Sequence, residues 1–166
     1  MTDIIFDIDG TLMNVEKRVQ WAKKHKKDTD RVMNWDMFLD PLVMLEFDRP
    51  NIDVCSIAKS LNILERFEID LPVAMSNNRI IITSARNERH RDVTMKQLAF
   101  AGVRYDSMYL RKDNDFRPDD VVKAELLGKI ITDGFDPTVA FDDRNQVVNK
   151  WRELGIHCYQ VRTGDF

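Results

Sequence analysis

The chain has 166 residues, of which 43% are hydrophobic and 32% charged, and its formal net charge at pH 7 is −3. This composition is typical of a globular protein, and the length allows one domain with a sizeable core. No apolar run is long enough to span a bilayer, and the N-terminus carries no secretory signal pattern. We therefore expect a cytoplasmic protein without membrane contact, in the host cytoplasm if the gene is viral. Cys55 and Cys158 are expected to be reduced structural thiols.

The first predicted element covers residues 4–12, which read Ile-Ile-Phe-Asp-Ile-Asp-Gly-Thr-Leu. Its apolar beginning indicates a buried strand. Asp7 and Asp9 are two positions apart and lie on the same side of an extended backbone, so their charges need a cation, a proton or a basic side chain nearby. Gly10 allows the backbone to turn directly behind them. An Asx-turn after a surface strand is the structural alternative for these residues.

Residues 13–76 favour helices over strands. Three segments have apolar residues at helical spacing, and the second is interrupted by Pro41: 14–27, 32–45 and 52–67. Some sixty residues are too many for one crossover helix, so we expect a small helical insertion beside the site. The basic run 23–27 suits a solvated helix end better than a nucleic-acid contact. The three tryptophans suit packing better than base stacking: Trp21, Trp35 and Trp151.

From residue 79 onward, strand and helix patterns alternate. The predicted strands are 79–83, 107–110, 138–141 and 157–161, and the predicted helices are 88–101, 119–131 and 145–154. This alternation predicts an α/β fold of Rossmann-like type, with a mostly parallel sheet flanked by helices. We expect one domain over residues 1–166, with the helical insertion at about 13–76 after the first strand. The carboxyl ends of parallel strands lie at one edge of the sheet, and open α/β sheets have their ligand-binding sites at that edge.

Polar residues that could bind a phosphate or a metal ion follow two of these strands. The strand 79–83 leads into Ser84 and Arg86, whose hydroxyl and guanidinium groups can bind a phosphate, although Ser and Thr also cap helices. The strand 138–141 leads into Asp142 and Asp143. Desolvated carboxylates need partners, and their oxygens are the ligands that Mg²⁺ prefers.

Lys123 lies early in the helix predicted at 119–131, from where its side chain could reach back to the strand edge. Its ammonium group would offset the crowded carboxylates and pair with a phosphate. Asp119 precedes it by one helical turn, so we expect Asp119 to orient Lys123. A solvated surface position is the ordinary alternative for a helical lysine.

In this order, these segments resemble the four motifs of the haloacid dehalogenase superfamily, whose members are mostly magnesium-dependent phosphatases. The first motif, D-x-D-G-T, reads Asp7-Ile8-Asp9-Gly10-Thr11. The resemblance implies that Ser84 supplies the hydroxyl of the second motif, with Thr83 possible if the alignment slips by one residue. It also implies that Lys123 is the third motif and that Asp142 and Asp143 are the fourth, with Asp143 touching the metal directly and Asp142 behind it.

From about residue 79 to the C-terminus the chain more particularly resembles the 3′-phosphatase domain of phage polynucleotide kinase-phosphatases. The segments 111–123 and 141–152 and the closing Gly164-Asp165-Phe166 carry this likeness. Around Arg18 the sequence departs from the Gly-Arg-Gly-Pro-Tyr pattern of that family. The chain contains no G-x-x-x-x-G-K-[ST] phosphate loop, so we expect a phosphatase that stands without the kinase half.

The resemblance implies phosphomonoester hydrolysis through an aspartyl-phosphate, in nucleic-acid repair. The implied catalytic residues are Asp7, Asp9, Ser84 and Lys123; the implied substrate contacts are Thr11, Arg18, Arg86 and Asp119; the implied ligands of a Mg²⁺ cofactor are Asp7, Asp9, Asp142 and Asp143. The expected substrate is a 3′-phosphorylated nucleic-acid end or a nucleotide. The alternatives are a small-molecule phosphatase such as a 5′(3′)-nucleotidase and a non-catalytic binding module on the same fold. The sequence does not determine the oligomeric state.

Overall fold

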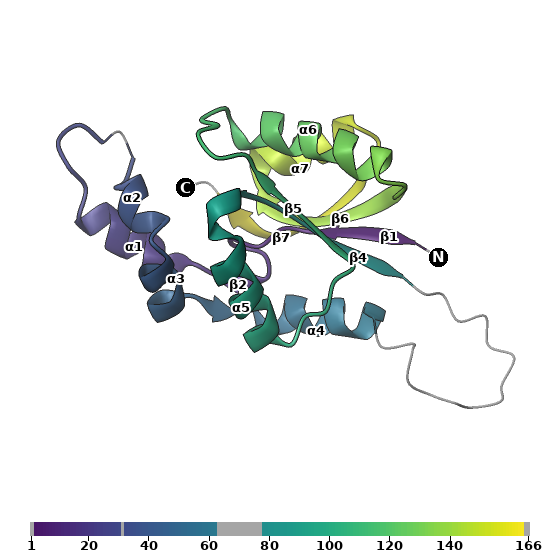
Figure 1. Cartoon of the computed structure of the whole chain (residues 1–166), viewed down its shortest axis with the longest axis horizontal. Coiled ribbons are helices and arrows are strands. Elements are labelled where there is room, and N and C mark those ends of the chain that lie inside the picture. Colours follow the sequence, from purple (N-terminus) through teal and green to yellow (C-terminus); the bar gives the residue numbers. More distant parts are fainter. Residues whose placement is uncertain (1, 31, 63–77, 165–166) are drawn as a thin grey trace, which may run out of the picture.

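A computed structural model describes residues 2–30, 32–62 and 78–164 of the chain. At its centre is a five-stranded sheet in the order β5–β4–β1–β6–β7, in which every neighbouring pair is parallel (Figure 1). The strands are β1 Asp3–Phe6, β4 Arg79–Asn87, β5 Ser107–Arg111, β6 Pro137–Arg144 and β7 His157–Gly164. The predicted Rossmann-like α/β fold is therefore confirmed. The strand order reverses on either side of β1, and open parallel sheets bind their ligands at such a point.

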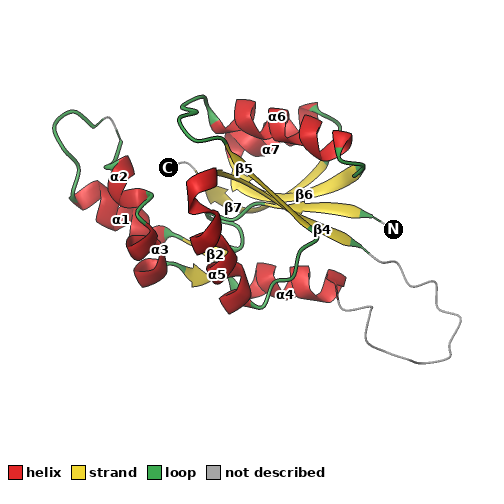
Figure 2. Ribbon diagram, in the orientation of Figure 1, coloured by secondary structure: helices red, strands yellow, loops and turns green. Residues whose placement is uncertain are grey.

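Helices cover both faces of this sheet (Figure 2). On one face lie α4 Ile52–Asn62 and α5 Arg91–Ala101, preceded by the short helix η2 Glu88–His90, and on the other lie α6 Asp119–Thr132 and α7 Asn145–Glu153. Side chains alternate along a strand, so Ile4 and Phe6 pack beneath the first pair of helices and Ile5 beneath the second. This burial on both faces explains the unbroken apolar run in β1.

Two strands extend further than their sequence patterns predict. β4 continues through Ser84 to Asn87, and β6 continues through Asp142 and Asp143 to Arg144. The pairing register shifts after Ser84 in β4 and after Asp142 in β6. Bulges of this kind bend a strand and re-aim its side chains, and they are common beside active sites. The polar residues of the second and fourth motifs therefore belong to irregular strand ends rather than to loops.

The helical insertion stands to one side of the sheet (Figure 1). It contains α1 Glu16–Lys24, α2 Trp35–Phe38 and α3 Pro41–Phe47, and an antiparallel ribbon that we did not predict, β2 Met13–Asn14 with β3 Arg49–Pro50, closes its base. Pro41 occupies the first turn of α3, where its missing N–H costs no hydrogen bond. The helix α4 falls within the predicted insertion but packs against β4. The rest of the predicted helix, 63–67, lies outside the described residues.

The expectations for the two cysteines and for two of the tryptophans are also met in the described part of the chain. Cys55 and Cys158 are free and buried. Trp151 is completely buried in the core, and Trp21 packs between His25 and Phe47 within the insertion. None of the helices that the structure describes is long and apolar enough to cross a membrane.

Candidate active site

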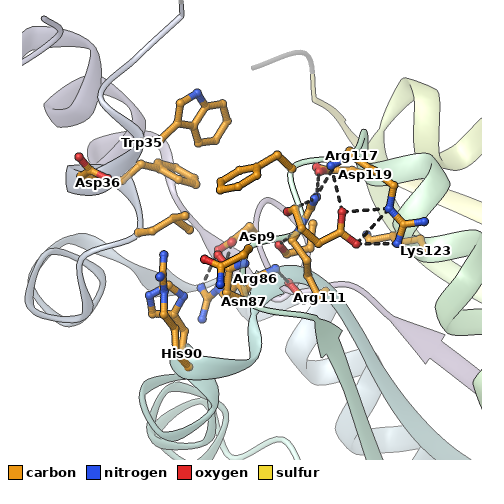
Figure 3. Close-up of a pocket in the computed structure, with 18 of the residues that line it drawn as sticks. Asp9, Trp35, Asp36, Arg86, Asn87, His90, Arg111, Arg117, Asp119 and Lys123 are labelled. Atoms are coloured by element: carbon orange, nitrogen blue, oxygen red, sulfur yellow. Dashed lines mark hydrogen bonds and ion pairs between the residues drawn. The ribbon is translucent and has the colours of Figure 1, made fainter. Parts of the chain in front are cut away.

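A cleft of about 900 Å³ opens at the carboxyl edge of the sheet, facing the helical insertion (Figure 3). Side chains of α2 and of the loop between β5 and α6 form its outer walls. Six of the predicted site residues line it: Asp7, Asp9, Ser84, Arg86, Asp119 and Lys123. Parallel strand ends and the first turn of α6 thus bring together residues that are far apart in the sequence.

Two residues that line the cleft, Asp7 and Lys123, form a group with the buried Asp142 and Asp143 that we call the Asp7 cluster. Asp7 follows β1 directly, and its backbone N–H donates to the carbonyl of Phe141 in β6 at 3.0 Å. Lys123 Nζ donates to Asp7 Oδ1 and to Asp142 Oδ2, both at 2.6 Å. All four side chains are buried. The ammonium group therefore fixes the orientation of the Asp7 carboxylate.

Protein donors surround Asp142. Besides Lys123, Trp151 Nε1 donates to its Oδ2 at 3.1 Å, and the backbone N–H groups of Asp143 and Arg144 donate to its Oδ1 at 3.0 and 3.3 Å. A carboxylate with four donors gains little by turning toward another ligand. Asp142 therefore holds the Lys123 ammonium group in place. Trp151 serves both as a core residue and as a partner of this carboxylate.

Asp143 differs from Asp142, because its Oδ1 is buried without a hydrogen-bond partner among the described residues. Ligand oxygens of Asp7, Asp142 and Asp143 lie within 4.8 Å of one another. Burial and the neighbouring carboxylates raise the pKa of Asp7, and burial followed by Asp142 raises that of Asp143 to about 7. A cation would offset the repulsion among these three carboxylates, which a single lysine does not, so the Asp7 cluster fits a hard divalent cation with oxygen ligands.

The absence of a side chain at Gly10 leaves space for the Asp143 carboxylate. The φ of Gly10 is +89°, and a Cβ on Gly10 would lie 2.1 Å from Asp143 Oδ2. Two backbone hydrogen bonds stabilise the turn around Gly10. The Gly10 N–H donates to the Met13 carbonyl and the Met13 N–H donates to the Ile8 carbonyl, both at 2.8 Å. The glycine of the first motif is therefore needed for its backbone conformation and for the space it leaves.

A second group, which we call the Asp9 cluster, lies on the insertion side of the same turn: Asp9, Arg18, Asp48 and Arg86. Arg86 donates to Asp9 through Nη2 at 2.6 Å and Nε at 2.9 Å, and Arg18 Nη2 also contacts Asp9 Oδ1. Burial would raise the pKa of Asp9, but Arg18 and Arg86 outweigh it and hold that pKa far below its usual range. In the resting protein Asp9 is therefore an anion.

Asp48, which our sequence reasoning missed, completes the Asp9 cluster. Its carboxylate forms an ion pair with Arg18 Nε at 2.9 Å and accepts a hydrogen bond from Gln97 Nε2 at 2.9 Å. Burial raises the pKa of Asp48 to about 6, while its ion pair with Arg18 favours the charged form that balances the second arginine. It follows α3, beside the exposed Arg49, in a position that looks like an ordinary surface acid in the sequence.

The other predicted site residues have mixed positions. Ser84 lines the cleft and Thr83 does not, which supports Ser84 as the second-motif hydroxyl. Thr11 is completely buried and does not line the cleft. Arg18 also lies behind the cleft, with its donors directed to Asp9, Asp48 and the Phe38 carbonyl.

The prediction that Asp119 orients Lys123 is wrong. Asp119 forms ion pairs with Arg111 at the end of β5 and with Arg144 at the end of β6, whereas Lys123 is held by Asp7 and Asp142. Spacing of i, i+4 places both residues on one face of α6, but the first turn of the helix lies above the two arginines and Lys123 reaches down to the strand edge. Asp119 remains in the cleft wall (Figure 3).

A parallel α/β sheet with this order of acidic, hydroxyl, lysine and acidic motifs defines a haloacid dehalogenase-type phosphatase. A family model described as the polynucleotide kinase PNKP phosphatase domain matches residues 39–166, and the chain belongs to this family.

Solved structures agree with this assignment. A chain of the Pnkp1/Rnl/Hen1 complex is similar with 27% identity and a TM-score of 0.72, covering 99% of this chain and 47% of its own length. A chain of the Pnkp1/Rnl/Hen1 RNA repair complex has 28% identity and the same TM-score, with 99% and 43% covered. The present chain thus spans less than half of these relatives. A haloacid dehalogenase family enzyme of Bacteroides thetaiotaomicron, an Asp12Ala mutant in complex with magnesium and inorganic phosphate, shares the fold at 13% identity and a TM-score of 0.58, with 100% of this chain and 96% of that one covered.

Proposed function

We propose that the chain is a magnesium-dependent phosphomonoesterase that removes the 3′-phosphate from polynucleotide ends. The observation that carries this proposal is the setting of Asp7, whose carboxylate is held by Lys123 at 2.6 Å on the floor of an open cleft and lies beside two further buried carboxylates. Membership of the PNKP phosphatase domain family and likeness to a chain of an RNA repair complex support the choice of a nucleic-acid substrate.

In the first step, a carboxylate oxygen of Asp7 attacks the phosphorus atom in line with the leaving oxygen. The new bond joins Asp7 to phosphorus, the bond from phosphorus to the 3′-oxygen breaks, and Asp9 gives a proton to that oxygen. Lys123 and Ser84 line the cleft on the side where the transferred phosphoryl group would lie. Both can donate to its oxygens and stabilise the spreading negative charge.

The Asp9 cluster sets a condition for this proton transfer. Two arginines keep Asp9 ionised at rest, so its acid form needs a negative charge nearby. A bound phosphate dianion supplies that charge and opposes the arginines, which favours uptake of a proton by Asp9 as the substrate enters. In the second step, Asp9 takes a proton from the water that attacks the aspartyl-phosphate. Inorganic phosphate leaves, and Asp7 is restored.

Asp7, Asp143 and the backbone carbonyl of Asp9 would hold Mg²⁺, with Asp142 behind them. When bound, the ion would neutralise the excess charge of the Asp7 cluster and reduce the repulsion between the anionic nucleophile and the anionic substrate. The Oδ1 of Asp143 is buried and has no hydrogen-bond partner among the described residues, which supports this assignment, because a buried carboxylate oxygen without a donor is costly unless a cation faces it.

A substrate panel tests the proposal. Release of inorganic phosphate is measured from a 3′-phosphorylated oligonucleotide, the same oligonucleotide with a 5′-phosphate, and 3′- and 5′-mononucleotides, each with magnesium and after chelation. We expect the 3′-phosphorylated oligonucleotide to have the highest kcat/KM and chelation to abolish turnover until magnesium is restored. A preference for mononucleotides would replace the proposal with a nucleotidase, and phosphate release from none of the substrates would refute it.

A further inference from the structure

The mouth of the cleft carries two exposed aromatic side chains that neither cluster uses. Trp35 begins α2 and is 46% exposed, and Phe116, in the loop between β5 and α6, is 91% exposed. Both line the same cleft as Asp7. Trp35 lies across the cleft from Arg117, the chain neighbour of Phe116 (Figure 3). Two large apolar side chains on opposite walls of a polar cleft indicate a place for an apolar, flat part of a ligand.

The loop that presents Phe116 is held in place on both sides of this residue. Arg111 Nη1, at the end of β5, donates to the carbonyls of Asp115 and Arg117 at 3.0 and 2.6 Å. The Arg117 backbone N–H also donates to Asp115 Oδ1 at 3.0 Å. The backbone is therefore anchored to the sheet while the phenyl ring remains in solvent. A ring on an anchored loop loses little conformational entropy when a ligand covers it.

Trp35 packs against a residue of its own helix. Its ring meets Phe38 edge-on, with the centroids 5.6 Å apart, and the Phe38 ring packs in turn against the Arg18 guanidinium at 4.1 Å. Arg18 pairs with Asp9, so a continuous series of contacts connects the indole to the active site. The packing that we predicted for Trp35 accounts for this edge and leaves the rest of the indole exposed.

We infer that Trp35 and Phe116 form a stacking subsite for the nucleobase adjacent to the phosphate that is removed. This inference rests on the proposed function and adds to it the part of the substrate that carries no phosphate. Every nucleobase has a flat π-face, so stacking on aromatic side chains binds a terminal nucleotide without selecting its sequence. The cleft volume of about 900 Å³ is far more than a phosphate group fills. Arg89 also lines the cleft and provides positive charge for the neighbouring phosphodiester.

The test compares two oligonucleotides that both end in a 3′-phosphate. In one the last nucleotide has its base, and in the other a tetrahydrofuran abasic unit replaces that nucleotide. We expect the wild-type protein to prefer the first, and the ratio of the two kcat/KM values to fall about tenfold in Phe116→Ala and in Trp35→Ala. Phe116→Tyr and Trp35→Phe keep a stacking ring and should retain most of the preference.

Phe100→Ala is the matched control, because Phe100 is 78% exposed on α5 and does not line the cleft. It should leave both the activity and the ratio at wild-type values. A ratio that stays unchanged in either alanine variant overturns the subsite, and so does an equal loss on both oligonucleotides. If the wild-type protein hydrolyses both oligonucleotides equally well, the proposed function stands and the subsite is refuted. If it hydrolyses neither, the proposed function fails and the subsite with it.

Discussion

The Asp7 and Asp9 clusters differ in charge balance although their leading residues are two positions apart in the sequence. In the Asp7 cluster three carboxylates face one lysine, and one buried carboxylate oxygen has no donor among the described residues. In the Asp9 cluster two carboxylates face two arginines, so charges of opposite sign are matched. The first cluster therefore has more carboxylates than basic groups, whereas the second has equal numbers of the two.

This difference assigns separate roles to the two sides of one turn. A charge-balanced group keeps its geometry whether or not a ligand is present, whereas a group with excess negative charge gains free energy when a cation arrives. Strands β1 and β6 and helix α6 hold the Asp7 cluster, while the Asp9 cluster joins the sheet to the helical insertion through Arg18 and Asp48. The insertion thus contacts Asp9, the proposed proton donor, rather than Asp7, the proposed nucleophile.

The strongest test of this division is Asp7→Asn. An amide in place of the proposed nucleophile should lower kcat by about a thousandfold or more, because the proposed covalent intermediate could not form. Asp3→Asn is the matched control, since Asp3 lies at the other end of β1 and pairs with Arg79 away from the cleft. It should keep nearly all activity. Turnover by Asp7→Asn within tenfold of the wild-type rate would remove Asp7 as the nucleophile.

A smaller loss is expected from Gly10→Ala. The new methyl group would collide with the Asp143 carboxylate, and the φ of +89° disfavours any L-residue. We expect kcat/KM to fall about a hundredfold, together with weaker magnesium binding in a titration that follows activity or melting temperature. Gly128→Ala is the control, because nothing lies within 4 Å of a Cβ there and alanine favours the helix α6. Equal activity of the two variants would contradict this account of Gly10.

Removing the charge of Asp48 should have a milder effect. In Asp48→Asn the two arginines keep one acidic partner instead of two, so their positive charge acts more strongly on Asp9 and hinders its protonation. We expect kcat to fall about tenfold while the magnesium concentration for half-maximal activity stays the same, because the Asp7 cluster is untouched. A shift in that magnesium concentration comparable to the loss in kcat would show that the two clusters are not independent.

The smallest effect concerns stability alone. Arg79 donates to both oxygens of Asp3 at 2.6 Å, and this hydrogen bonding lowers the pKa of Asp3. A lowered folded-state pKa stabilises the fold above the unfolded value of about 4 and loses this contribution as the pH falls below it. Asp3→Asn should therefore lower the free energy of unfolding by about 1 kcal/mol at pH 7, with the difference from wild type shrinking toward pH 2 in urea titrations. A difference that is constant with pH would exclude the ion pair as its cause.

Local pattern and parallel topology were sufficient to predict much of this protein. An apolar run before Asp7 and the alternation of strands and helices after residue 79 predicted the sheet, and the resemblance to the haloacid dehalogenase motifs assigned Lys123 and Asp143 to its edge. The helix boundaries in that half agree closely, for example α5, which ends before Gly102 in the left-handed conformation. The extended ends of β4 and β6 and the ribbon of β2 with β3 were not predicted, because bulges and two-residue strands leave little trace in side-chain periodicity.

The sequence by itself determined the fold class and the acidic edge, because the periodicity of side chains and the direction of parallel strands follow from backbone geometry. Only the tertiary structure decided which charged groups meet. Asp48 and Gln97 became partners of the arginines beside Asp9, Asp119 turned to Arg111 and Arg144, and Trp35 remained half exposed at the mouth of the cleft. Such pairings depend on the positions of side chains from segments tens of residues apart, and no local pattern encodes them.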